Sequence, residues 1–170
     1  FVVGYILYST GIIYNLRNVK IIAWTTLVFG ILLYIADKSR FNKKISTNLN
    51  FQTIFFISFF QVLSLIPGVS RAGITITAAR ILKFNRLDSS KISFLLSIPA
   101  LTGASLIGFK DLFNQSVDFN YLVIFAIISS FIFSFLTVKF FLIYINKFSM
   151  NVFVIYRIII ALILFSIIYT

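Results

Sequence analysis

Arg71 is the residue of this sequence with the clearest potential for chemistry, because it stands inside an apolar stretch. An arginine at the centre of a membrane helix costs roughly 2.5 kcal/mol or more, so it needs a partner or a purpose. Its guanidinium offers a planar fork of donors that matches phosphate oxygens. Ser70 adds a hydroxyl beside it, while Gly68 and Gly73 remove side chains where a ligand would approach the backbone. These residues predict a phosphate site.

The residues around Arg71 also predict a helix end that attracts anions. Pro67 and Gly68 interrupt one apolar helix, and a second, shorter one starts near Ile74. The N–H groups and the positive dipole end of that second helix point into the turn. We therefore expect the N–H groups of Gly73 and Ile74 to face the phosphate. Thr75 is expected to contribute a second hydroxyl.

One alternative to the phosphate site is structural. In that case Pro67 and Gly68 only kink a helix, and Arg71 pairs with a carboxylate on a segment outside this sequence. The other intramembrane arginine, Arg157, lies about six residues into the last apolar run, near its cytoplasmic end. There a long side chain can reach the membrane interface, so we expect Arg157 to snorkel rather than to act in the site.

Missing residue types limit what this sequence can do by itself. It contains no histidine, no glutamate and no cysteine. It therefore supplies no histidine nucleophile, no glutamate base and no carboxylate-rich metal site. We expect no metal ligands in this chain, and a hydrolytic site would need residues from elsewhere.

The elements that hold these residues are membrane helices. The chain of 170 residues is 60% hydrophobic and only 11% charged, against roughly 25% charged residues in a soluble domain. Its net charge of +11 is divided among short loops, as in the positive-inside pattern of membrane proteins, so nucleic acid is not an expected partner. Residues 1–170 form one integral membrane domain. Because the sequence begins with phenylalanine inside an apolar run, we interpret it as an N-terminally truncated fragment.

Residues 51–84 are predicted to form a re-entrant helix-turn-helix hairpin. Residues 51–66 would extend only about 24 Å as a helix, which falls short of a full crossing. Basic loops stand on both sides of this segment, at 37–50 and 80–91, and both should lie on the cytoplasmic side. The predicted fold is thus an all-α polytopic bundle with such a hairpin. Its full or partial spans are 1–14, 21–36, 92–109, 121–145 and 152–169.

Residues 67–76 (PGVSRAGITI) and 93–100 (SFLLSIPA) resemble the second signature region of the bacterial undecaprenyl-diphosphate phosphatases, a family linked to bacitracin resistance. Residues 156–158 (YRI) are similar to its C-terminal pattern. Three departures stand out: the family often has a second serine where Ala72 stands, an acidic residue where Lys91 stands, and a glycine near Ala161. The first weakens any role for a hydroxyl at that position, and the second concerns a loop or interface contact.

The resemblance implies a multi-pass enzyme of the bacterial cytoplasmic membrane. Such an enzyme hydrolyses undecaprenyl pyrophosphate to undecaprenyl phosphate and phosphate, which recycles the lipid carrier for peptidoglycan synthesis. It implies that Ser70 and Arg71 are catalytic and that Gly68, Gly73, Ile74 and Thr75 bind the pyrophosphate. It also implies a glutamate-rich motif, a histidine and a divalent cation (Mg²⁺ or Ca²⁺) whose ligands lie mostly outside this chain. The expected partners are the lipid and the bilayer, and a homodimer is left open.

Two other functions fit the same residues. A carrier or flippase would bind the anionic lipid head at a broken helix without cleaving it, since transporters use this architecture. A purely structural membrane subunit is the third alternative. An upstream glutamate-rich motif followed by a histidine would favour the enzyme.

Overall fold

The computed structural model describes residues 16–114 and 121–169, apart from the side chains of residues 107 and 109–114. Over these residues the regular elements are helices, which confirms the predicted all-α class. They are α3 (Val19–Asp37), α4 (Ile45–Asn48), α5 (Phe51–Gln61), the 3₁₀ helix η1 (Val62–Leu65), α6 (Arg71–Ile81), α7 (Arg86–Asn114), α8 (Tyr121–Lys147) and α9 (Asn151–Tyr169).

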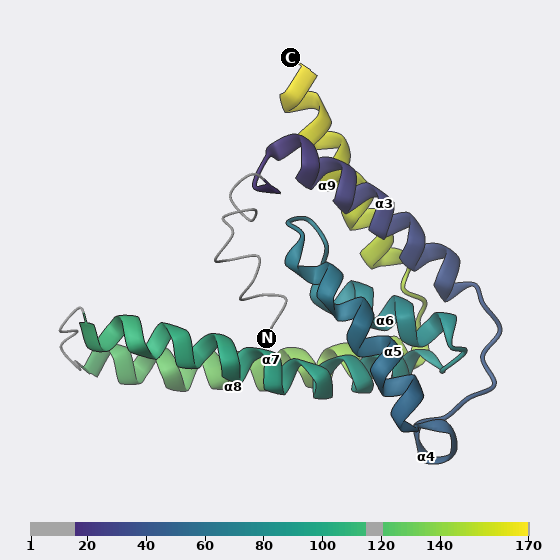
Figure 1. Ribbon diagram of the computed structural model, residues 1–170, viewed down its shortest axis with the longest axis horizontal. Coiled ribbons are helices and arrows are strands. Elements are labelled where there is room, and N and C mark those ends of the chain that lie inside the picture. Colours follow the sequence, from purple (N-terminus) through teal and green to yellow (C-terminus); the bar gives the residue numbers. More distant parts are fainter. Residues whose placement is uncertain (1–15, 115–120, 170) are drawn as a thin grey trace.

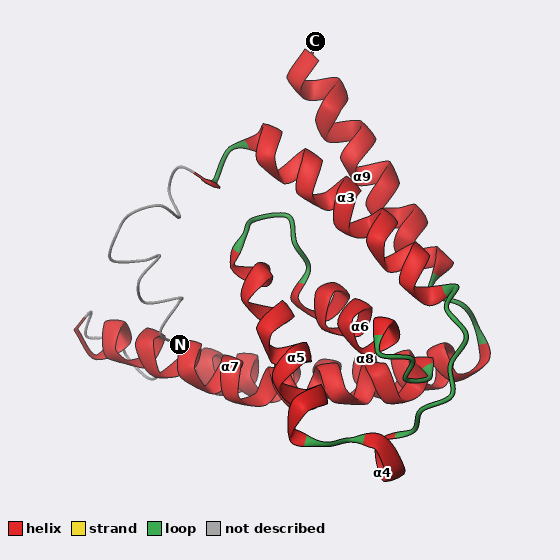
Figure 2. Ribbon diagram, turned by 45° about the vertical axis from the view of Figure 1, so that its right-hand side comes forward, coloured by secondary structure: helices red, strands yellow, loops and turns green. Residues whose placement is uncertain are grey.

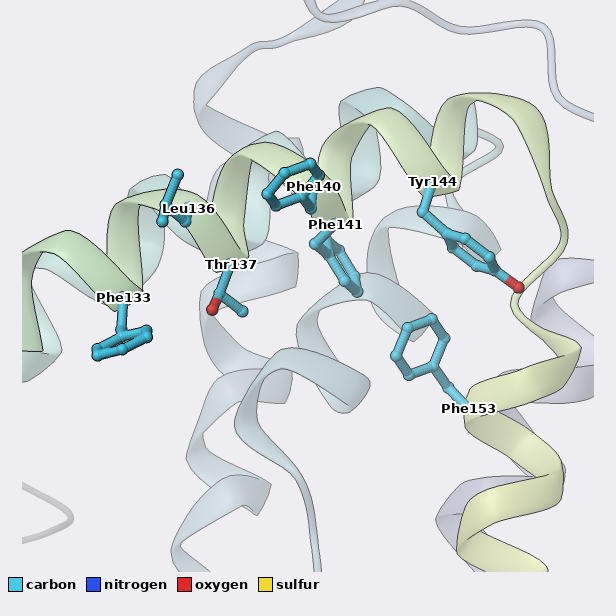
Figure 3. A pocket seen from close by; sticks show the side chains of 7 residues that line it. All are labelled: Phe133, Leu136, Thr137, Phe140, Phe141, Tyr144 and Phe153. Carbon is cyan, nitrogen blue, oxygen red and sulfur yellow. The ribbon is translucent and has the colours of Figure 1, made fainter.

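The helices form two long arms with a short hairpin between them. Helices α3 and α9 run side by side as one arm, and α7 and α8 run side by side as the other (Figure 1). Helices α5 and α6 lie in the angle between the arms, as the turned view also shows (Figure 2). The turn that joins α5 and α6 is thereby placed inside the protein, beside α3 and α9.

Three of the described helices, α3, α8 and α9, are long and apolar enough to cross a membrane. They coincide with the predicted spans 21–36, 121–145 and 152–169. The predicted span 92–109 lies within α7, which continues through Pro99 as one helix. Most side chains of α8 are exposed and apolar, as expected for a surface that faces lipid. The chain is a multi-pass membrane protein.

The re-entrant hairpin is present, and its two ends lie together. Helix α5 starts with a capping box in which Asn50 and Thr53 bond each other's backbone. The apolar run Phe51–Leu65 is too short for a full crossing, and α6 leads back. At the open end, the N–H of Lys43 donates to the carbonyl of Lys83 at 3.1 Å, and the N–H of Asn85 donates to the carbonyl of Lys43 at 3.3 Å. The two basic loops therefore share one side.

A cluster of three charged residues, Asp37, Arg80 and Arg86, ties this open end to the long helices. Arg86 donates from Nε and Nη2 to the two carboxylate oxygens of Asp37, at 2.8 and 2.9 Å. Arg80, on α6, places its Nε 3.4 Å from the same carboxylate and bonds the backbone carbonyls of Asp37, Ser39 and Phe84. The N–H of Met150, before α9, also donates to Asp37. We call these three residues the Asp37 cluster.

Helix α6 is the centre of the packing. Every residue from Ile74 to Arg80 is buried. One apolar cluster joins Ile76 of α6 to α3, α8 and α9, and a second joins Ala78 and Ala79 to α5 and α7. A helix that is packed on all sides holds its first turn in a fixed place, which is what a binding site requires.

Candidate functional site

The 67–73 turn is shaped by Pro67 and Gly68. Gly68 has φ +88°, a left-handed backbone conformation that favours glycine, and the N–H of Val69 bonds the carbonyl of Ile66 at 3.1 Å. Proline followed by a glycine with positive φ is the signature of a type II turn. A Cβ at Gly68 would collide with the hydroxyl of Thr25 on α3. Glycine therefore permits both the conformation and the close approach to α3.

Two adjacent threonines of α3 hold the turn. The hydroxyl of Thr25 donates to the carbonyl of Pro67 at 2.7 Å, and the hydroxyl of Thr26 donates to the carbonyl of Gly68 at 3.3 Å. These contacts join residues 42 positions apart in the chain. The turn is thus held against a membrane-spanning helix rather than projecting from the hairpin.

Arg157 reaches the same turn from α9. Its Nη2 donates to the carbonyl of Gly68 at 2.7 Å, and the residue is only 8% exposed. The prediction that Arg157 snorkels to the membrane interface is therefore wrong. A carbonyl in the turn gives the guanidinium a buried partner, and two glycines make room for it: a Cβ at Gly30 would lie 3.3 Å from Arg157 Cβ, and one at Gly73 would lie 3.0 Å from Nη1.

Helix α6 begins at the turn with Ser70 as its cap. The Ser70 hydroxyl accepts a hydrogen bond from the N–H of Gly73 at 3.1 Å, and the N–H of Ile74 donates to the Ser70 carbonyl at 2.9 Å. The N–H groups of Gly73 and Ile74 are thus engaged and not available to an anion as the sequence suggested. The groups without an acceptor inside the helix are those of Arg71 and Ala72. Ser70 and Ala72 are exposed, so this end of the helix is open.

Arg71 and Thr75, four residues apart, lie on the same face of α6, which packs against α7. The half-buried Arg71 extends towards α7, where Nη1 donates to the carbonyl of Ser97 at 3.2 Å. Thr75 is 1% exposed, and its hydroxyl bonds the carbonyls of Arg71 and Ala72 and the hydroxyl of Ser93, 2.7 Å away. Arg71 is in place to meet a ligand, whereas Thr75 joins the first turn of α6 to α7.

Replacing Ser70 with alanine should weaken the start of α6. The substitution removes the side-chain acceptor of the Gly73 N–H, so the free energy of unfolding should fall by about 1 kcal/mol, whereas glycine at this position should cost only a few tenths. An SDS titration of the purified protein, followed by circular dichroism, measures both. Equal losses in the two variants would contradict the capping role.

Comparison with known proteins identifies the family of this chain. A profile of the family described as bacitracin resistance protein BacA matches residues 1–163. The chain belongs to the BacA family. An undecaprenyl-diphosphatase of Pelagibacter ubique is 67% identical over 169 residues, 99% of this chain and 66% of that protein. Those of Elusimicrobium minutum and Saccharophagus degradans are 42% and 39% identical, cover 87% and 91% of this chain, and are themselves covered over 56% and 58% of their length.

This BacA-family chain thus spans two thirds or less of the length of the curated relatives it matches. Its described part brings Gly68, Ser70, Arg71 and Gly73 together at one helix end, with Ile74 and Thr75 buried behind them. Residues that the sequence interpretation left out of the site are Thr25, Thr26 and Arg157. Only Arg157 stands out in the sequence, as an arginine inside an apolar run, and nothing in the sequence singles out the two threonines.

The carboxylates of the described residues do not suit a divalent cation at this turn. Among those residues no three His, Cys, Asp or Glu side chains are grouped as metal ligands. Asp37 is engaged with Arg80 and Arg86. Asp88 accepts hydrogen bonds from the N–H of Ile45 at 3.0 Å and from the amide of Asn85 at 2.8 Å. Both lie at the open end of the hairpin, away from the turn.

Proposed function

We propose that this chain carries the anion-binding part of a phosphatase that hydrolyses undecaprenyl pyrophosphate to undecaprenyl phosphate and inorganic phosphate. The observation that carries the proposal is the open first turn of α6, where the exposed end of the helix lies beside the half-buried Arg71. Helix N-termini and guanidinium groups both favour phosphate. Membership of the BacA family and the 67% identity to an undecaprenyl-diphosphatase give further support.

In the proposed reaction, an oxygen nucleophile attacks the terminal phosphorus and the anhydride P–O bond breaks. Net addition of water yields inorganic phosphate and the lipid monophosphate, and the bridging oxygen leaves with the lipid. Negative charge therefore grows on the bridging oxygen in the transition state. The guanidinium of Arg71 and the N–H groups of Arg71 and Ala72 are fixed donors that would stabilise this charge, and such preorganised donors commonly supply the largest catalytic term.

Ser70 and Thr75 have supporting roles in this proposal. Ser70 holds the N–H of Gly73, so the first turn of α6 keeps its open donors aimed outward. Its exposed hydroxyl can also donate to a phosphate oxygen, because a hydroxyl that accepts one bond still has its hydrogen. Thr75 ties the same turn to Ser93 of α7. Gly68 and Gly73 leave room for the turn and for Arg157.

A divalent cation, Mg²⁺ or Ca²⁺, belongs to the proposal only with ligands other than the described residues. Hard cations of this kind prefer several carboxylate and carbonyl oxygens. Asp37 and Asp88 are engaged elsewhere, so neither of these described carboxylates would hold such a cation at the turn. The nucleophile and the general base likewise belong to residues other than those described.

Replacing Arg71 with alanine is the direct test. Loss of one charged donor from the site should lower phosphate release from a prenyl pyrophosphate by about 10²- to 10³-fold. The measurement uses the natural full-length protein in detergent, with Arg71→Lys as a variant that keeps the charge without the fork. Arg40→Ala is the matched control, because Arg40 is an exposed arginine of the basic loop, and it should retain turnover.

Turnover that is unchanged in the Arg71→Ala protein would overturn this role. A wild-type protein that binds the prenyl pyrophosphate tightly but releases no phosphate would favour the carrier function instead. Failure of the wild type both to bind and to hydrolyse would leave only a structural subunit.

We place the protein in the bacterial cytoplasmic membrane, with the open end of the hairpin on the cytoplasmic side. Exposed basic residues of both loops gather at that end, and positive charge is retained in the cytoplasm. They include Lys38, Arg40, Lys44 and Lys83. Accessibility of single cysteines introduced in these loops to an impermeant thiol reagent tests the orientation. A homodimer remains a prediction, which the mass of the detergent-solubilised protein would test.

A further inference from the structure

Arg157 is a buried arginine, and one of its guanidinium nitrogens has no hydrogen-bond partner among the described residues. It is 8% exposed, and Nη2 bonds the carbonyl of Gly68. Nη1 is fully buried and has no hydrogen-bond partner among the described residues. An unpaired donor on a charged group is costly in a membrane protein, so an arginine kept in this state calls for a reason beyond holding one carbonyl.

The unpaired nitrogen is aimed at the first turn of α6. A Cβ at Gly73 would lie 3.0 Å from Arg157 Nη1 and 3.3 Å from the Ser70 hydroxyl oxygen. Nη1 and the Ser70 hydroxyl therefore border the same small space, which glycine leaves empty. The donors of Arg71 and Ala72 that lack helix acceptors belong to this same turn. The unpaired Nη1 of Arg157 thus lies beside other hydrogen-bond donors of this turn.

No described carboxylate is available to pair with Arg157. Asp37 is bound to Arg80 and Arg86, and Asp88 caps the backbone near Ile45, both at the other end of the hairpin. Within the described residues, the positive charges at this turn are therefore not matched by protein acids. A negatively charged ligand is the chemistry that would complete the arrangement.

We propose that Arg157 is a second anion-binding arginine of the site, which holds one phosphoryl group of a diphosphate while Arg71 and the start of α6 hold the other. This inference rests on the proposed function. Arg71 belongs to α6 and extends towards α7, whereas Arg157 belongs to α9. The two guanidinium groups therefore approach the turn from different helices. Two such groups suit a ligand with two phosphoryl groups better than one with a single phosphate.

The test is the affinity for inorganic pyrophosphate, measured by isothermal titration calorimetry on the full-length protein in detergent. Arg157→Ala should weaken binding about 10- to 100-fold, the usual effect of losing a charge-assisted hydrogen bond. Arg157→Lys should lie between the alanine variant and the wild type. Binding of inorganic phosphate should change much less, because the group that Arg157 holds is absent. A short prenyl diphosphate should lose the same factor as pyrophosphate.

Thr25→Val is the matched control for a purely structural role. Thr25 also bonds a carbonyl of the turn, at 2.7 Å, but it has no charge and no unpaired donor. Its loss should disturb turnover more than pyrophosphate affinity. Should Arg157→Ala fail to fold, Gly73→Ala provides a second variant: the new methyl group would crowd Nη1 at 3.0 Å and the Ser70 side chain at 3.2 and 3.3 Å, and pyrophosphate affinity should fall.

Two results would overturn the inference. One is wild-type pyrophosphate affinity in a folded Arg157→Ala or Gly73→Ala protein. The other is an Arg157→Ala protein whose losses match those of Thr25→Val for pyrophosphate and phosphate alike. Either result leaves the proposed hydrolysis intact as long as Arg71→Ala strongly lowers turnover, so failure of the two ideas can be told apart.

Discussion

Gly68→Ala is expected to lower phosphate release by about a hundredfold or more. The backbone at Gly68 has φ +88°, where an alanine costs about 1–2 kcal/mol. The added Cβ would also meet the hydroxyl of Thr25 and lie 2.7 Å from the carbonyl oxygen of Ile22, which is backbone and cannot rotate away. The turn must therefore shift away from α3, and a displacement of about 1 Å in a catalytic site can cost this much activity.

Gly108→Ala is the control for this prediction. Gly108 lies in α7, and a Cβ there would have nothing within 4 Å, so the substitution only improves helix propensity, by about 1 kcal/mol. It should retain full turnover in the same phosphate-release assay. A Gly68→Ala protein with turnover within a fewfold of the wild type would show that the close contact with α3 does not position the site.

Asp37→Asn is expected to cause the largest loss of stability, about 3–5 kcal/mol. Asp37 is the carboxylate shared by Arg80 and Arg86, and it is 5% exposed while Arg80 is 1% exposed. Removing its charge leaves two guanidinium groups close together without compensation, and breaking a buried pair in this way is strongly destabilising. An SDS titration of the purified protein, followed by circular dichroism, gives the change in the free energy of unfolding.

Asp88→Asn provides the comparison. Asp88 is a half-buried carboxylate that bonds an N–H and an amide and has no arginine within ion-pair distance in the described structure. An asparagine can keep part of this bonding, so the loss should be about 1 kcal/mol. Equal losses in the two variants would mean that the charge of Asp37 contributes nothing special to the open end of the hairpin.

The hairpin could be predicted because its signals are local. The run before Pro67 is too short to cross a membrane, the pair Pro67 and Gly68 demands a turn, and the basic loops on either side require both ends to share a face. None of these arguments needs to know which helices pack together. In the structure, the backbone hydrogen bond from Lys43 to Lys83 holds the two basic loops together, as these arguments require.

The prediction of which N–H groups of the turn are open was wrong, because it put the start of α6 three residues too far along the chain. The sequence suggested that α6 starts near Ile74, whereas it begins at Arg71 with Ser70 as the cap. Serine is a preferred cap residue, so this signal was present in the sequence. A difference of three residues moves the open N–H groups from Gly73 and Ile74 to Arg71 and Ala72.

The contacts of Arg157, Thr25 and Asp37 had no local signal. Arg157 meets a carbonyl 89 residues away, Thr25 meets one 42 residues away, and Asp37 binds an arginine 49 residues away. Such pairs depend on how α3, α6, α7 and α9 are arranged, which periodicity and charge counts do not determine. An arginine near a helix end reads as a snorkelling residue until the neighbouring helix is known.

The bonds that α3 and α9 make to the 67–73 turn also decide which atoms the turn presents to a ligand. The carbonyl oxygens of Pro67 and Gly68 are bonded by Thr25, Thr26 and Arg157. Carbonyl lone pairs repel phosphate oxygens, and here they are turned away and covered by donors. The open face of the turn therefore presents mainly N–H and O–H donors. These donors are already in place before any substrate binds.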